Sequence, residues 1–118
     1  MRIPADFELI GFFEVEPSLR IPGTPWAYNG LTFETIRGDH CVRFHIEMDV
    51  GEVSLRWTQG GIQRAAVSLK WVQALFIDTI QGIEVLTATQ VSGNPDLAVE
   101  LRLRPEVSVK LVAQPNVP

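Results

Sequence analysis

The sequence predicts an all-β fold, an antiparallel meander of roughly seven to nine strands that forms a sandwich or a half-open barrel. Three observations support this class. Apolar residues alternate with polar ones along most of the chain, as in strands with one buried face. Turn-forming residues separate these stretches at short intervals, which favours antiparallel neighbours. No convincing helical repeat lies between the stretches. The pattern leaves the choice between sandwich and barrel open.

The length and composition suit one globular domain over residues 1–118, with a frayed tail at 114–118. The chain has 118 residues, of which 46% are hydrophobic and 20% charged, so it should bury a real core. No apolar run approaches the roughly 20 residues of a membrane-spanning helix, and the opening residues do not resemble a secretory signal. The single cysteine, Cys41, fits a reducing compartment. We therefore expect a cytoplasmic protein that does not bind membranes.

The first third of the chain is the least regular. Residues 7–15 could form a strand or a short helix, and a strand is slightly favoured because Phe7, Leu9 and Phe13 share one parity. Residues 17–30 are rich in proline and glycine and are predicted to form a long irregular loop. A short strand over residues 31–37 follows, closed by Gly38 and Asp39.

The middle of the chain carries the clearest alternation. Residues 41–50 alternate strictly, and residues 53–58 repeat the pattern. Gly60 and Gly61 supply the positive φ angles of a tight hairpin, after which residues 65–71 form the next strand. Trp57 and Trp71 fall on apolar faces and are predicted to lie in the core, each with an acceptor for its indole N–H.

The last third continues as hairpins. Residues 75–80 and 83–91 are rich in β-branched side chains and are joined by Gln81 and Gly82. Residues 92–96 give the strongest loop signal in the chain. Two further strands are expected, over residues 97–104 and 107–112.

The charge balance disfavours nucleic-acid binding. Fourteen acidic residues stand against ten basic ones, a formal net charge of −4, and no basic stripe for a phosphate backbone is present. The first 59 residues hold the whole of this excess, which could steer a basic partner toward the protein. The alternative is that this acidic excess is the ordinary surface charge that keeps a protein soluble.

No residue pattern predicts catalysis, a metal or a cofactor. Cys41, His45 and Glu47 share a strand face, but neighbours two apart on a strand lie nearly 7 Å from each other, which suits charge pairing better than a shared ion. His40 faces the other way. Neither a nucleophile elbow nor a phosphate-binding glycine loop is present.

The loop before residue 31 is the best candidate for a partner-binding site. It places Trp26 and Tyr28 among turn-formers, where they could anchor a protein partner or plug one end of the fold. Acidic pairs flank turns elsewhere in the first half of the chain. The predicted partner-binding residues are Trp26, Tyr28, Asn29, Glu14, Glu16, Glu47 and Asp49.

The chain also resembles the small all-β immunity proteins of bacterial polymorphic-toxin systems. The similarity spans about residues 26–112 and lies in a rhythm: an aromatic opening (residues 26–31), a long alternating strand (42–50), shorter strands (67–72), and a final Leu101-Arg102-Leu103. The resemblance implies a non-enzymatic protein that neutralises a toxin by stoichiometric binding, and an acidic inhibitor suits a basic toxin such as a nuclease. The alternatives are a small-ligand carrier with a barrel-like cavity and a structural or assembly β domain.

Overall fold

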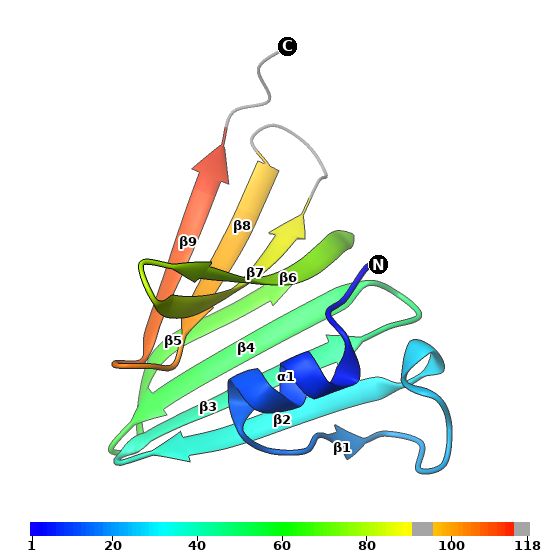
Figure 1. The fold of residues 1–118 in the computed structure, drawn as a ribbon, viewed down its shortest axis with the longest axis horizontal. Coiled ribbons are helices and arrows are strands. Elements are labelled where there is room, and N and C mark those ends of the chain that lie inside the picture. The colour runs from blue at the N-terminus through cyan, green and yellow to red at the C-terminus, as the bar shows by residue number, and fades with distance from the viewer. Residues whose placement is uncertain (91–95, 115–118) are drawn as a thin grey trace. The chain divides into compact units, whose positions relative to one another are not determined.

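The computed structural model describes residues 1–90 and 96–114, and strands dominate it (Figure 1). The described elements, in order, are α1 (Asp6–Phe13), β1 (Ser18–Leu19), the 3-10 helix η1 (Trp26–Tyr28), β2 (Gly30–Arg37), β3 (His40–Glu47), β4 (Glu52–Gln59), β5 (Ile62–Leu69), β6 (Val72–Ile80), β7 (Ile83–Gln90), β8 (Asp96–Arg102) and β9 (Ser108–Gln114). The predicted all-β class is confirmed, with nine strands among the described residues.

The strands form two antiparallel sheets, in the orders β1-β2-β3-β4-β5 and β6-β7-β8-β9. Within each sheet every strand pairs with its neighbour in sequence, which is the predicted meander, and only β5 and β6 are consecutive described strands that do not pair. Because the described strands divide between two sheets, they do not close into a single barrel. The chain also divides into two compact units, residues 13–70 and residues 1–12 with 71 onward.

The unit of residues 13–70 contains the five-stranded sheet. One face of this sheet is apolar, because the alternation seen in the sequence places every second side chain on it. Phe13 stacks on Phe33 with ring centroids 4.5 Å apart and lies 5.5 Å from the ring of Phe44. The buried residues of this unit include Phe13, Leu31, Phe33, Val42, Phe44, Ile46, Val53, Leu55 and Leu69.

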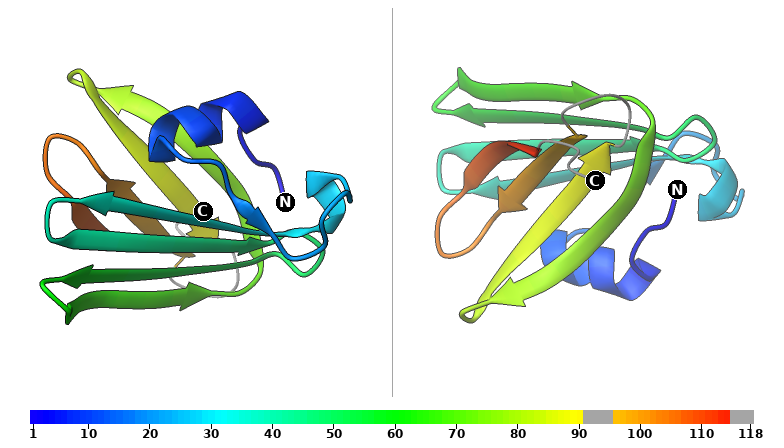
Figure 2. Two further views of the ribbon diagram at one scale, coloured as in Figure 1. Left: turned by 90° about the horizontal axis from the view of Figure 1, so that it is seen from below. Right: turned by 90° about the horizontal axis from the view of Figure 1, so that it is seen from above.

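The turns of this sheet fall at two opposite ends. The β2–β3 and β4–β5 turns lie at one end, and η1 lies at the other (Figure 2). Gly60 and Gly61 have φ angles of +57° and +79°, the positive pair expected for a two-residue hairpin whose twist matches its strands. The predicted hairpin is thus confirmed.

The other unit contains most of α1 and the four-stranded sheet. The N-terminal segment runs beside β6, where the N–H of Arg2 donates to Gln73 O at 3.0 Å and the N–H of Leu75 donates to Arg2 O at 2.8 Å. The apolar residues buried in this unit are Leu9, Phe12, Val72, Leu75, Val85, Leu86, Ala88, Val99, Leu101, Leu103 and Val107.

Two expectations from the sequence are wrong. Residues 6–13 form a helix, not the slightly favoured strand, and Leu9, Phe12 and Phe13 are buried while Phe7 is 75% exposed. This i, i+3, i+4 spacing is helical. Trp71 is 69% exposed and is not a core residue, since its positive φ of 59° breaks the alternation that precedes it.

The expectations for Trp57 and for residues 17–30 are met in part. Trp57 is half-buried, and its Nε1–H donates to Nδ1 of His40 at 3.0 Å, so it has the expected acceptor. Residues 17–30, expected to be wholly irregular, also contain β1 and η1. The predicted loop at 92–96 and the predicted frayed tail lie almost entirely outside the described residues.

Candidate functional site

The loop that leads into β2 is built around the side chain of Asn29, which is fully buried. Its Oδ1 accepts hydrogen bonds from the N–H groups of Ile21 (2.9 Å) and Gly30 (3.0 Å). Its Nδ2 donates to the carbonyl oxygens of Ile21 (2.7 Å) and Thr24 (3.1 Å). One amide therefore satisfies four backbone groups of an otherwise irregular segment. Asn29, a predicted partner-binding residue, sits inside the loop and fixes its shape.

The two aromatic residues of this loop have different environments. Trp26 is half-buried, and its ring packs edge-to-face with that of Phe33, with the ring centroids 6.2 Å apart and an interplanar angle of 76°. Tyr28 is 69% exposed. Trp26 thus packs against the fold, whereas Tyr28 is exposed to solvent. The sequence had left two roles open for both residues, plugging one end of the fold and anchoring a protein partner.

The turn between β3 and β4 lies beside this loop. The N–H of Met48 donates to Asn29 O at 3.2 Å, and both segments lie at the same end of the sheet (Figure 1). Asp49 and Val50 are exposed on the turn, and Glu52 begins β4 directly opposite Glu47. Within the described part of the chain, neither Asp49 nor Glu52 forms an ion pair. We call the surface of Tyr28, Asp49, Val50 and Glu52 the tyrosine–acid end.

Glu47 is held in a network next to this end. Its Oε1 lies 2.8 Å from Nε2 of His45 and 3.4 Å from Nε of Arg20, and Nδ1 of His45 lies 2.7 Å from Oγ1 of Thr32. A Cβ on Gly30 would lie only 2.5 Å from the same Oε1. The carboxylate therefore rests against the glycine backbone, and Gly30 leaves the space that the network occupies.

The order hydroxyl, imidazole and carboxylate is also that of a hydrolytic triad. Thr32 lies in the middle of the sheet, however, and β1 and β3 both pair with β2 at this residue. The neighbouring backbone N–H groups therefore serve the sheet and do not converge on a substrate oxygen, as an oxyanion hole requires. The geometry fits a network that holds Glu47 in place.

The remaining two predicted residues lie away from the tyrosine–acid end. Glu14 forms an ion pair with the last residue of β2, Arg37, at 3.0 Å, whereas Asn29 directly precedes the first residue of that strand. An eight-residue strand separates its ends by about 24 Å. Glu16 is exposed between Glu14 and β1. The seven predicted residues are thus brought together only in part, and Glu14 and Glu16 form a separate group.

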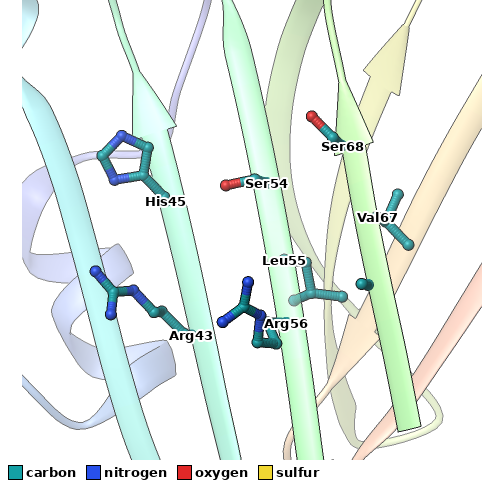
Figure 3. A pocket seen from close by; sticks show the side chains of 8 residues that line it. Arg43, His45, Ser54, Leu55, Arg56, Val67 and Ser68 are labelled. Atoms are coloured by element: carbon teal, nitrogen blue, oxygen red, sulfur yellow. The ribbon is translucent and has the colours of Figure 1, made fainter. Parts of the chain in front are cut away.

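A second feature is a shallow depression on the face of β3, β4 and β5 that lies opposite the apolar face (Figure 3). We call this polar face of the sheet its outer face. The side chains of the depression come from alternate positions of adjacent strands, so His45, Ser54 and Ser68 form one row and Arg43, Arg56 and Ala66 form the next. Arg43 and Arg56 are direct cross-strand partners. Figure 3 shows their guanidinium groups on the same side of the sheet as the ring of His45.

Glu52 and the Arg43–Arg56 pair were not predicted from the sequence. Both follow from the β3–β4 register, which places Glu47 opposite Glu52 and Arg43 opposite Arg56. The sequence did contain a signal for this register, because the two strands flank one short turn. Counting outward from that turn pairs Glu47 with Glu52 and Arg43 with Arg56.

Among the described residues, no group of three or more Cys, His, Asp or Glu side chains could hold a metal ion. None of the described helices has the length and apolar character needed to cross a membrane.

Comparisons with known proteins bear on the fold. No family model matches the chain, and no curated protein sequence matches it. Among solved structures, one chain of a contact-dependent growth inhibition toxin–immunity protein complex from Klebsiella pneumoniae 342 is similar, with a TM-score of 0.80. The match covers 95% of this chain and 96% of that chain at 18% sequence identity. At this identity the similarity establishes a shared fold.

Proposed function

We propose that the protein is an immunity protein that neutralises a toxin by stoichiometric, non-catalytic binding in the cytoplasm. The observation that carries the proposal is the structural match, which extends over nearly the whole length of both chains at a TM-score of 0.80. The matching chain belongs to a complex between a toxin and an immunity protein. A fold does not by itself assign a function, so the features of this chain decide which side of such a complex it represents.

The tyrosine–acid end supports the immunity side. Tyr28 is an exposed aromatic residue on a segment that the buried amide of Asn29 holds by four hydrogen bonds. A fixed aromatic anchor loses little conformational entropy on binding. Asp49 and Glu52 add negative charge next to it, which suits a basic protein such as a nuclease toxin.

The alternative of a small-ligand carrier has less support. The outer depression of the five-stranded sheet is lined mainly by arginine, histidine and serine side chains, whereas ligand pockets are mostly apolar. A structural or assembly role is not favoured by a specific observation. Protein binding therefore remains the function that this geometry supports best.

Growth protection tests the proposal directly. We would co-express the chain with the toxin domain encoded by the reading frame next to its gene and measure growth, then isolate the complex by size-exclusion chromatography. We expect growth to be restored and the two proteins to co-elute at a fixed ratio. Full toxicity in the presence of the folded chain would contradict the proposal.

A pair of charge variants sharpens the experiment. Asp49→Lys with Glu52→Lys should weaken protection. Asp78→Lys with Glu106→Lys changes the net charge equally at exposed positions in the other unit and should not weaken it. Equal loss of protection in both variants would indicate a general charge effect in place of a defined surface.

A further inference from the structure

We infer that the outer face of β3 and β4 docks an acidic segment of the partner protein, through Arg43 and Arg56. This inference rests on the proposed function and specifies the chemistry of a second contact region. The two arginines are direct cross-strand partners. Like charges directly opposite each other on a sheet are destabilising, so the fold carries an unfavourable pair in the middle of its largest sheet.

The neighbouring acid neutralises this pair only weakly. Glu34 is the cross-strand partner of Arg43 on the other side, but the closest N–O distance is 4.0 Å and both side chains are more than half exposed. Exposed pairs of this kind contribute little. In the described part of the chain, Arg56 forms no ion pair at all. Two guanidinium groups are therefore available to an incoming anion.

The surroundings make this pair accessible. Ser54, Ala66 and Ser68 have short side chains, so the sheet surface beside the arginines is low and forms the depression of Figure 3. Arginine presents its N–H donors as a planar fork that matches a carboxylate. The hydroxyl groups of the two serines add hydrogen-bonding positions along the floor.

The rest of the face favours a protein over a nucleic acid as the source of the anion. On the same face, Glu34 lies beside Arg43 at the end of the arginine row, and the Glu47–Glu52 pair lies two rows along the strands. These carboxylates would repel a continuous phosphate backbone. Ile36, also on this face, is 71% exposed. Arginine combined with an exposed apolar side chain is typical of protein interfaces. An acidic peptide segment with an apolar residue fits this pattern.

The first experiment replaces both arginines with glutamine. Arg43→Gln with Arg56→Gln removes the repulsion, so the midpoint of urea unfolding should stay the same or rise. Affinity for the toxin domain, measured by calorimetry, should nevertheless fall by at least about tenfold. Arg2→Gln with Lys110→Gln is the matched control, because both residues are exposed, carry the same charge and lie in the other unit; this variant should bind as the parent does. A purely structural role for the arginines would lower stability and binding together.

The outcomes separate this inference from the proposed function. If the parent chain neither binds nor neutralises the toxin domain, the proposed function fails. If the parent and the glutamine pair bind the toxin equally well, the function stands and this inference is overturned. A single-stranded oligouridine RNA, titrated at physiological salt, tests the other occupant. We expect no binding; RNA binding that is lost in the glutamine pair, with toxin affinity unchanged, would overturn the inference in favour of a nucleic-acid surface.

Discussion

The N–H of Met48 donates to the carbonyl oxygen of Asn29 at 3.2 Å, and this bond joins the loop before β2 to the turn between β3 and β4. Tyr28 belongs to the first segment and Asp49 to the second, although twenty residues separate them in the sequence. The geometry of the tyrosine–acid end therefore depends on the local order of both segments. In the first segment that order comes from the buried amide of Asn29, which bonds to Ile21, Thr24 and Gly30.

Replacing Asn29 should destabilise the protein. Asn29→Ala leaves the backbone groups of Ile21, Thr24 and Gly30 without their four hydrogen bonds to the amide. A buried polar group without a partner costs about 1–3 kcal/mol, and water entry would satisfy some of them. We expect a loss of about 2–3 kcal/mol in the free energy of unfolding, measured by urea denaturation.

Asn29→Asp is the companion variant. It keeps an acceptor for the N–H groups of Ile21 and Gly30 but places a second oxygen against two carbonyl oxygens, where Nδ2 now donates. It should therefore also be destabilising, and more so at neutral than at acidic pH, because the protonated acid can donate one hydrogen bond. A change below 0.5 kcal/mol in both variants, at the level of ordinary surface substitutions, would show that the amide does not hold the loop.

Tyr28 should contribute to binding and not to stability. Its ring is 69% exposed, so Tyr28→Ala removes little buried area and should change the unfolding free energy by less than about 0.5 kcal/mol. Truncating an aromatic anchor at an interface commonly costs about 2 kcal/mol or more, so toxin affinity should fall more than tenfold. Phe7→Ala, at an equally exposed aromatic residue on α1, is the control and should leave affinity unchanged.

The strands at the centre of the five-stranded sheet could be predicted because they bury alternate side chains on one face. The alternation over residues 41–50 places Val42, Phe44 and Ile46 on the buried side, and only a period of two does this in an extended chain. The turns could be predicted for a related reason, since Gly60 and Gly61 adopt the positive φ angles that a tight hairpin needs.

The helix and Trp71 could not be predicted in the same way. Phe7, Leu9 and Phe13 share one parity, but Leu9, Phe12 and Phe13 are the residues that become buried, and a segment of eight residues is too short for its period to be decisive. Trp71 continues the alternation of β5 in sequence. Its positive φ interrupts the extended backbone, and a tryptophan gives no sequence signal for that conformation.

The candidate site depended on information that the sequence does not contain directly. Glu47 and Asp49 were correctly placed next to a turn, but the hydrogen bond from Met48 to Asn29 is what brings that turn to Tyr28. The Arg43–Arg56 pair needs the register of β3 and β4. The sequence states which side chains a strand carries. Which of them become neighbours depends on the register in which two strands pair, and this follows only from the folded structure.

Gly11→Ala should stabilise the protein. Gly11 lies inside α1, and nothing lies within 4 Å of the position that a Cβ would occupy. Alanine favours the helix over glycine by about 0.8–1.0 kcal/mol, because the unfolded chain loses less entropy on folding. We expect a gain of about 0.5–1 kcal/mol by urea denaturation. A loss of stability would show that the helix packs more closely at this position than the structure indicates.

Gly30→Ala is the matched substitution at a crowded position and should have the opposite sign. Its Cβ would lie 2.5 Å from Oε1 of Glu47 and 3.1 Å from Nε of Arg20, so the carboxylate has to move away from His45. The cost is the loss of a part-buried hydrogen bond and an ion pair, about 1–2 kcal/mol. NMR should show the chemical shifts of the His45 ring changing in Gly30→Ala and not in Gly11→Ala. Glu47→Gln provides an independent check, because it removes the charge while leaving Gly30 intact, and it should perturb the same ring. If the ring shifts of His45 were unchanged in both Gly30→Ala and Glu47→Gln, the network of Arg20, His45 and Glu47 would not exist in solution.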